Sequence, residues 1–133
     1  SVELLELELA DLKDLMANNL SNAKEYLEKL IPGFQKAADL FRMGNEQEAH
    51  KFYLQILDGI DWISQVVQTV VNSRNKELEG QDLKDRQERL TGLMTQMLEA
   101  NQNQDWGLLA DLLGYEMIPF YENWQEALSK MEA

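Results

Sequence analysis

Two pairs of carboxylates in this sequence have a spacing that could hold a divalent cation. Glu25 and Glu28 are three residues apart, and so are Asp58 and Asp61. Residues three apart lie on the same side of an α-helix, so each pair would present its two carboxylates together. Carboxylate oxygens are ligands that Mg²⁺ accepts in proteins, so metal-dependent hydrolysis is the first chemistry to test.

The two pairs resemble the ExxE and ExxD pairs of MazG-type nucleotide pyrophosphohydrolases, which implies a carboxylate- and Mg²⁺-dependent nucleotide hydrolase. Their helical positions argue against that activity. On a wheel of about 100° per residue, Glu25 and Asp58 point nearly opposite to the apolar stripes of their helices. The four acids would therefore not converge on one Mg²⁺ site inside a bundle, and the hydrolase stays a second alternative.

Other residues offer little chemistry. A di-iron bundle needs two Glu-x-x-His motifs, whereas this chain has one histidine. That residue, His50, lies well off the apolar stripe of its helix and is expected to be a solvated side chain. The sequence offers no nucleophile-base pair and no glycine-rich phosphate loop. We therefore expect no enzymatic activity, no cofactor, no metal and no small-molecule substrate.

The charge balance narrows the class of partner. The chain has 133 residues with 24 acidic and 12 basic side chains, and its formal net charge is −12. This charge repels nucleic-acid phosphates and anionic lipids, so the expected partner is a protein and neither nucleic acid nor membrane. The chain has no cysteine, no apolar run of membrane-spanning length, and glutamates in its opening SVELLELELA where a secretory peptide would be apolar. A cytoplasmic location is the expectation, unless a targeting segment has been removed.

Apolar residues recur at three- and four-residue spacings through almost the whole chain, which predicts an all-α protein. A first helix is expected through Phe41, a second from Asn45 to about residue 75, a third from about residue 83 to the NQNQD run, and a fourth capped by Asp105. Gly44 and Asn45 mark the first turn. Helices of about 20 to 40 residues joined by short polar loops predict one domain over residues 1–133, an up-down-up-down four-helix bundle.

Two features of the first helix leave alternatives open. Phe34 and Phe41 keep the phase of the apolar stripe beyond Pro32, which favours one long helix kinked at Pro32 over two separate helices. The alternation of Leu5, Leu7 and Leu9 would also suit a short strand over residues 2–9. Helix is favoured there because a lone strand has no partner with which to pair.

Each expected helix has an apolar stripe that should face the core. The residues expected on these stripes are Leu5, Leu9, Leu12, Met16, Leu20, Ala23, Leu27, Leu30, Phe34, Ala38 and Phe41; Ala49, Phe52, Tyr53, Ile56, Ile60, Ile63, Val67, Val70 and Val71; Leu83, Leu90, Leu93, Met94 and Met97; and Trp106, Leu109, Leu113, Met117, Phe120, Trp124 and Leu128.

The fourth helix also has apolar residues on its opposite side. We name this side the outer seam; it comprises Leu108, Tyr115 and Ile118, with Leu112 on its flank. A contiguous apolar patch is seldom left in water, so the outer seam, with Trp62 of the second helix, is expected to contact a partner protein or a second copy in a homodimer. The alternative is that other parts of the same chain cover it.

Arg86 lies within the apolar stripe of the third helix and Glu116 near the edge of the stripe of the fourth. A hairpin that turns near residue 102 brings the two to within about one helical turn of each other. This register predicts a semi-buried ion pair between Arg86 and Glu116, with a structural rather than a catalytic role.

The pattern L-A-D-L-L-x-Y-E-x-x-P-x-x-x-x-W, from Leu109 to Trp124, resembles one found in small uncharacterised bacterial helical proteins. That resemblance carries no known activity. In size and acidity the predicted bundle is also similar to flagellar export chaperones, which implies, by analogy of class alone, binding of an amphipathic client segment. The sequence therefore predicts a non-enzymatic interaction or adaptor protein that uses the outer seam, with an export-chaperone-like binder as the alternative.

Overall fold

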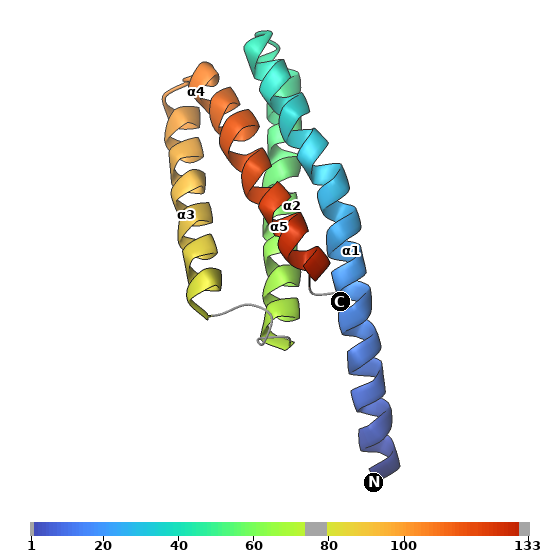
Figure 1. The fold of residues 1–133 in the computed structure, drawn as a ribbon. Coiled ribbons are helices and arrows are strands. Elements are labelled where there is room, and N and C mark those ends of the chain that lie inside the picture. Colours follow the sequence, from blue (N-terminus) through green and yellow to red (C-terminus); the bar gives the residue numbers. More distant parts are fainter. Residues whose placement is uncertain (1, 74–79, 131–133) are drawn as a thin grey trace.

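The protein is an all-α four-helix bundle in which consecutive helices run antiparallel (Figure 1). The structure, a computed structural model, describes residues 2–73 and 80–130, with the side chains of residues 21–69 and 82–130. The helices are α1 (Val2–Arg42), α2 (Glu46–Ser73) and α3 (Gly80–Gln102), followed by α4 (Trp106–Asp111), the π-helical turn η1 (Leu112–Met117) and α5 (Ile118–Lys130). The last three are continuous in sequence and form the fourth helix of the bundle. The predicted fold class is therefore confirmed.

Local signals mark two helix ends where the sequence predicts, whereas α3 begins at Gly80, slightly earlier than expected. Gly44 has a positive φ of 78°, a conformation that glycine adopts without steric cost, and it ends the turn after α1. At the start of α4, the backbone N–H of Leu108 donates a hydrogen bond to Oδ1 of Asp105 at 3.2 Å. That bond satisfies one of the free N–H groups of the first helical turn, so the predicted N-cap is confirmed.

The two prolines are accommodated in different ways. Helix α1 continues through Pro32, which confirms one long helix, and it is helical over residues 2–9 as well. Pro119 instead follows η1, a turn of wider i→i+5 hydrogen bonding. A proline has no N–H to donate to the preceding turn, and both prolines and π-helical turns are places where a helix departs from regular geometry.

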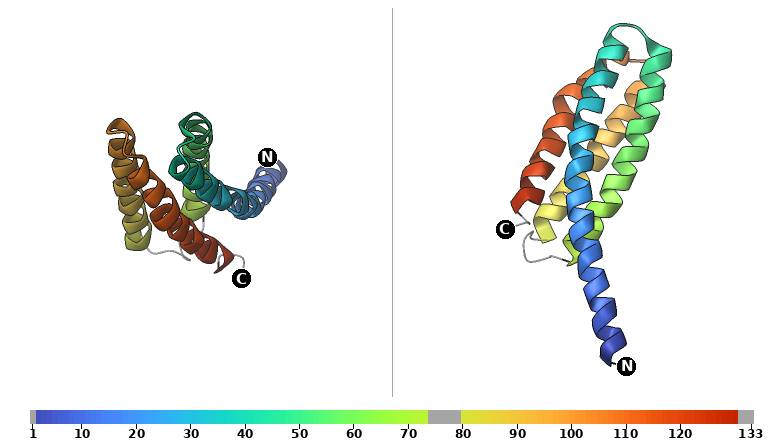
Figure 2. Two further views of the ribbon diagram at one scale, coloured as in Figure 1. Left: turned by 90° about the horizontal axis from the view of Figure 1, so that it is seen from above. Right: turned by 90° about the vertical axis from the view of Figure 1, so that its right-hand side faces the viewer.

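Helix α1 is the element on which the rest of the core is assembled. It packs along α2 on one side and along α4, η1 and α5 on another. Seen from above, α3 lies on the far side of the fourth helix from α1 (Figure 2). Among the described residues, α3 has close backbone contacts only with α4 and η1. The bundle is therefore closed around α1 and more open around α3.

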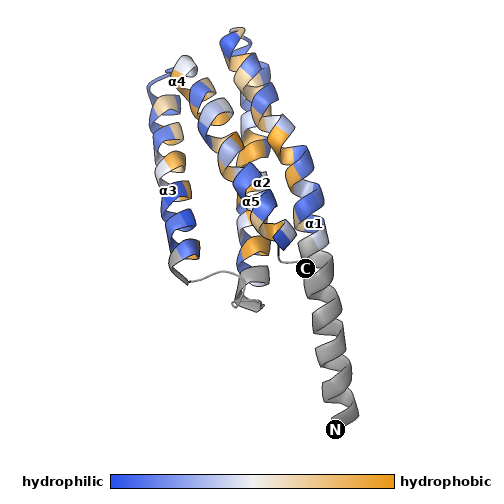
Figure 3. Cartoon of the chain, in the orientation of Figure 1, coloured by the Kyte–Doolittle hydropathy of each residue, from blue (hydrophilic) through white to orange (hydrophobic). Residues whose placement is uncertain are grey.

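The described core agrees with most of the predicted apolar stripes. The residues that are buried as predicted are Ala23, Leu27, Leu30, Phe34, Ala38, Phe41, Ala49, Tyr53, Ile56, Ile60, Ile63, Val67, Leu93, Met97, Leu109, Leu113, Met117, Phe120, Trp124 and Leu128. On the N-terminal half of α3, Leu83 and Leu90 are only partly buried. That half of α3 is mostly hydrophilic (Figure 3), which gives it little apolar surface with which to pack.

Some expectations fall on residues whose side chains lie outside the described ranges. These are the predicted stripe residues Leu5, Leu9, Leu12, Met16, Leu20, Val70 and Val71. The backbone of α1 there continues as a helix beyond the end of the other helices (Figures 1 and 2). No helix in the described part of the chain is both long enough and apolar enough to cross a membrane.

Candidate functional site

In the described part of the chain, a groove lies between α2 and α3. Among the described residues, no Cα atom of α2 lies within 8 Å of one of α3, although the two helices are consecutive in the chain. Closely packed helices have axes about 8 to 10 Å apart, so backbone approaches within that range are usual between true neighbours. Side chains of α2, α3 and α5 therefore line an open space rather than a packed interface.

The groove consists of two adjoining hollows. The lower hollow, of about 380 Å³, is enclosed by Ile63, Ser64, Val67, Gln68, Leu83, Arg86, Gln87, Leu90, Thr91, Phe120, Tyr121 and Trp124. The upper hollow, of about 480 Å³, is enclosed by Tyr53, Leu57, Ile60, Asp61, Ser64, Leu90, Thr91, Met94, Thr95 and Leu98. Ser64, Leu90 and Thr91 line both, so the hollows form one continuous groove.

Polar contacts bridge the two walls of this groove. Gln87 Nε2 of α3 donates a hydrogen bond to Gln68 Oε1 of α2 at 2.7 Å. Near the other end of α2, His50 Nε2 lies 3.1 Å from Asn101 Oδ1 of α3, and His50 Nδ1 lies 2.8 Å from the carbonyl oxygen of Glu46. The Gln87–Gln68 bond is exposed and lies in the wall of the groove, whereas the His50–Asn101 contact is part-buried and lies outside its lining.

His50 is therefore not the solvated side chain expected from the sequence. Its ring packs edge-on against Phe41 and Trp106, with centroids 5.3 and 5.0 Å away. The helical-wheel prediction placed His50 off the core because it assumed that α2 is buried along one stripe only. In the bundle, Phe41 at the end of α1 and Trp106 at the start of α4 meet on a second side of α2, where His50 lies.

Tyr121 lines the lower hollow with its side chain, but its hydroxyl oxygen is buried away from solvent. Its side chain is 2% exposed, and its hydroxyl makes no hydrogen bond to any described residue. Burial raises the pKa of Tyr121 well above its usual value; the nearby Ser64 hydroxyl opposes this shift in pKa and Tyr26 adds to it. Ser64 is close enough to influence the phenol but does not reach hydrogen-bond geometry. An unsatisfied buried hydroxyl costs about 1–3 kcal/mol of stability, so this donor requires an explanation.

Arg86 also lines the lower hollow, and its predicted ion pair with Glu116 is wrong. Its Nε donates to Asp82 Oδ2 at 3.0 Å, and its guanidinium lies 4.6 Å from the ring centroid of Trp124. Glu116 instead accepts a 2.7 Å bond from Arg89 Nη2. Arg89 lies nearly one helical turn beyond Arg86, a difference in register that the estimated turn position could not resolve.

The outer seam is smaller than the sequence predicts. Leu108 is 46% exposed and Tyr115 is 70% exposed, whereas Ile118 is partly buried against the core. Leu112 is 4% exposed and belongs to the core, so its expected role in partner binding is wrong. Its wheel position assumed a regular α-helix, but Leu112 begins the π-helical turn, which shifts the facing of the residues around it.

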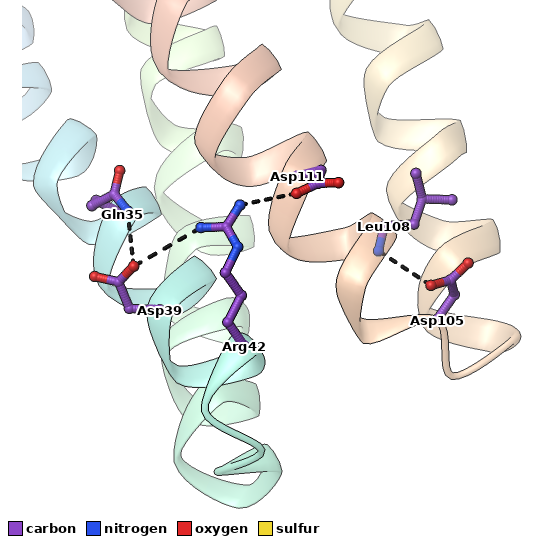
Figure 4. A network of polar contacts seen from close by, with 6 residues as sticks. All are labelled: Gln35, Asp39, Arg42, Asp105, Leu108 and Asp111. Carbon is purple, nitrogen blue, oxygen red and sulfur yellow. Dashed lines mark hydrogen bonds and ion pairs between the residues drawn. The ribbon is translucent and has the colours of Figure 1, made fainter.

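The remaining seam residues have contacts within the chain. Arg42 of α1 lies 5.3 Å from the centroid of the Tyr115 ring. Its Nη2 atom donates a hydrogen bond to Asp111 Oδ1 at 3.0 Å (Figure 4). Trp62, at 41% exposed, packs against Tyr26 with ring centroids 4.7 Å apart. The structure thus leaves Leu108 and Tyr115 as the accessible part of the outer seam and places Trp62 on another helix.

The acidic pairs do not form a site in the described part of the chain. Glu25, Glu28, Asp58 and Asp61 are all exposed, and Asp61 accepts a hydrogen bond from Gln65. Within the described residues, no cluster of three or more acidic, histidine or cysteine side chains is placed to hold a metal ion.

Sequence reasoning missed the groove because it depends on how far apart two helices lie. A signal for it was present in the third helix, where Leu83 and Leu90 are separated by six mostly charged residues. Tyr121 was missed although the signal was present, because it lies three residues before Trp124 and seven before Leu128, a spacing that places it at the edge of the same helical face.

The fold and the groove define the class of protein, an acidic all-α four-helix bundle with an open apolar groove between its second and third helices. The chain belongs to the family of the domain of unknown function DUF8042, whose family model matches residues 18–127. No curated protein and no solved structure matches the chain.

Proposed function

We propose that this protein is a non-enzymatic protein-interaction module that docks an amphipathic helix of a partner protein in the groove between α2 and α3. The observation that carries the proposal is the continuous apolar groove. Leu90 and Met94 lie in its wall as partly buried side chains. A partner helix would complete their burial, as in other helix-in-groove complexes.

The dimensions of the groove suit a short helix. Its lining extends from Tyr53 to Gln68 on α2 and from Leu83 to Leu98 on α3. At 1.5 Å per residue each of these segments is about 22 Å long. A partner helix of about 15 residues, with apolar side chains at three- and four-residue spacing, would fill that length.

Charge complementarity favours a basic partner. The chain has a formal net charge of −12, and the groove is lined by a single acid and a single base, Asp61 and Arg86. An amphipathic helix with lysine or arginine on its solvent-facing side would be attracted by the overall charge while its apolar side enters the groove. The described lining includes no histidine and no cysteine, so we assign it no catalytic step.

A bacterial, cytoplasmic setting is also part of the proposal and rests on the C-terminal pattern and the composition.

The test uses a defined probe. A labelled 15-residue peptide of leucine and lysine, with leucine at helical three- and four-residue spacing, is compared by fluorescence anisotropy with a scrambled peptide of equal composition. We expect the amphipathic peptide to bind more tightly than the scrambled one. Leu90→Glu, which places a charge at the junction of the two hollows, should weaken binding at least tenfold because the carboxylate would have to be desolvated.

Leu108→Glu is the matched control. It adds the same charge as Leu90→Glu, but at a side chain that is exposed on the outer seam. It should leave peptide binding unchanged. Equal binding of the two peptides, or unchanged binding by Leu90→Glu, would exclude the groove as the docking site.

The outer seam is a second candidate surface because Leu108 and Tyr115 are large, exposed side chains. If Leu108→Glu weakens peptide binding and Leu90→Glu does not, the partner docks on the seam. Light scattering of the unliganded protein tests whether either surface joins two copies. A dimer that Leu90→Glu dissociates would make a second copy the occupant of the groove.

A further inference from the structure

We propose that the N-terminal half of α3, residues 80–92, is a hinged arm that closes on α2 and covers the groove when no partner helix is docked. This inference rests on the proposed docking function, because closure of the arm would regulate access to the same groove. It follows from the uneven attachment of α3 to the bundle and from the apolar surface that the open groove leaves in contact with water.

Helix α3 is anchored in the bundle by its C-terminal half. Among the described residues its buried side chains are Leu93, Met97 and Ala100, whereas no side chain over residues 82–92 is buried. Its close backbone contacts are with α4 and η1, and with no other described element. A segment with few buried apolar contacts opens at a low cost in free energy, so the arm can move while the anchored half stays packed.

Contacts in solvent hold the arm in its open position. Arg89 of the arm pairs with Glu116 of η1, and these side chains are 58% and 44% exposed. The hydrogen bond from Gln87 of the arm to Gln68 of α2 is also exposed. Ion pairs and hydrogen bonds in solvent contribute little net stability, so the arm can give them up in exchange for the burial of apolar side chains.

The motion that closure needs is small. At 1.5 Å per residue Leu83 lies about 26 Å from Ala100, so a rotation of about 15° about Ala100 would move Leu83 by about 7 Å and Thr91 by about half as much. The Arg86 guanidinium lies 4.6 Å from the centroid of the Trp124 ring. It is at the end of a long side chain with many rotamers, which can keep this contact while the backbone of the arm moves.

Closure would bury apolar surface that the open form leaves in water. Leu57 of α2 and Leu90 of α3 are only partly buried. Met94 is also partly buried, and Leu98 is 54% exposed. All four side chains line the hollows of the groove. Removal of such surface from water is favourable, so the arm and a docked helix compete to cover the same residues. The apparent affinity for a partner is then reduced by the fraction of the protein that is closed.

A pair of cysteines can report this closure, because the chain has none of its own. Ser64 and Thr91 are suited to the test because both line the upper and the lower hollow. They lie about one helical turn from Gln68 and Gln87, which face each other across the groove, and on the same side of that bond. Ser64 and Thr91 therefore also face each other.

The open form is too wide for a disulfide at this level of the groove. A disulfide needs its two Cα atoms within about 4.4–6.8 Å. Among the described residues, no Cα atom of α2 lies within 8 Å of one of α3. A disulfide in the variant with Ser64→Cys and Thr91→Cys can therefore form only when the arm closes.

The experiment oxidises this double variant in a glutathione buffer at low protein concentration. We expect an intramolecular disulfide in most molecules, measured by mass spectrometry and by non-reducing electrophoresis. The oxidised protein should bind the leucine-lysine peptide at least tenfold more weakly than the same protein after reduction, because the arm then covers the groove.

Gln65→Cys with Gly92→Cys is the control pair. Each position is next in sequence to a test position, but both are exposed and neither lines the groove. The control pair should form no intramolecular disulfide. Far-UV circular dichroism of each variant checks that the helices are intact.

The outcomes separate this inference from the docking function. If the test pair oxidises no faster than the control pair, the arm does not close and the inference is overturned, whether or not the peptide binds. If the disulfide forms but the oxidised protein binds the peptide as tightly as the reduced protein, closure does not regulate the groove and the inference is again overturned. If the disulfide forms but the native protein binds no peptide, the docking function is wrong and the closure of α3 stands.

Discussion

Helix α2 has a neighbour on either side in the sequence, but it packs closely against only one of them. Against α1, Gly59 of α2 lies under the Tyr26 side chain, so closely that a Cβ atom at Gly59 would collide with the Tyr26 hydroxyl. Helix α1 meets η1 in a similar way at Gly114, which faces Ala38 and Arg42. In contrast, a Cβ atom at Gly92 of α3 would meet no neighbouring atom within 4 Å.

The difference shows what leaves a groove open. Where a helix pair has a glycine at the contact, the backbones can approach and large side chains interlock around it. Helices α2 and α3 lack such a contact among their described residues, and α3 brings only partly buried apolar residues to this side. The closed side supplies stability, and the open side retains apolar surface that a partner can bury.

The largest expected effect on stability comes from truncating one side chain on the α1 side of α2 and one on the α3 side. Phe34→Ala, at a fully buried residue of α1, should lower the free energy of unfolding by about 3–5 kcal/mol because it leaves a cavity in the packed core. Met94→Ala, in the wall of the groove, should cost much less because its environment is already half open to water. Urea unfolding of both variants measures the difference. Similar losses would mean that the α2–α3 side is as well packed as the α1 side.

A matched pair of glycine substitutions sharpens the comparison. Replacing a glycine inside a helix by alanine is stabilising by about 0.5–1 kcal/mol where space allows, so Gly92→Ala should raise the free energy of unfolding. Gly59→Ala gains the same helix propensity but pushes Tyr26 away, and it should be less stable than Gly92→Ala by about 1–3 kcal/mol. Thermal unfolding followed by circular dichroism measures both. If the two variants are equally stable, the close approach at Gly59 is not what joins α1 to α2.

The smallest expected effect on stability comes from the ionisation of the buried Tyr121 side chain, and it appears only at high pH. Burial raises the pKa of Tyr121 in the folded protein, so above pH 10 the unfolded chain loses this proton while the folded chain keeps it. Above pH 10 the free energy of unfolding should then fall with rising pH, by at most about 1.4 kcal/mol per pH unit for this group. Below pH 10 the ionisation of Tyr121 should not contribute to the pH dependence of stability. Burial also raises the pKa of Tyr53, which adds to the slope.

Tyr121→Phe removes this contribution, so the fall in stability above pH 10 should become shallower. Because the substitution also removes an unsatisfied buried hydroxyl, the variant should be at least as stable as the native protein at neutral pH. Urea unfolding at pH 7 and at a series of values above pH 10 checks both expectations. An unchanged slope would show that Tyr121 is solvated when the protein is folded.

The sequence by itself determined the features that depend on neighbouring residues along the chain. Four helices, the turn at Gly44, the cap at Asp105 and the continuity through Pro32 follow from local hydrogen bonding and from the period of the apolar residues. These signals act within a few residues, so they can be read from spacing. They could not show which side of α3 would remain open.

Only the tertiary structure decided how far apart the helices lie and which charges meet. The choice of Arg89 over Arg86 as the partner of Glu116 depends on the register of two helices, and the burial of Leu112 depends on one wide turn in the fourth helix. Small changes in rotation or translation move a side chain from the core to the solvent, and spacing along a single helix contains no information about its neighbours. For that reason the groove and the unpartnered Tyr121 hydroxyl emerge only when all the helices are assembled.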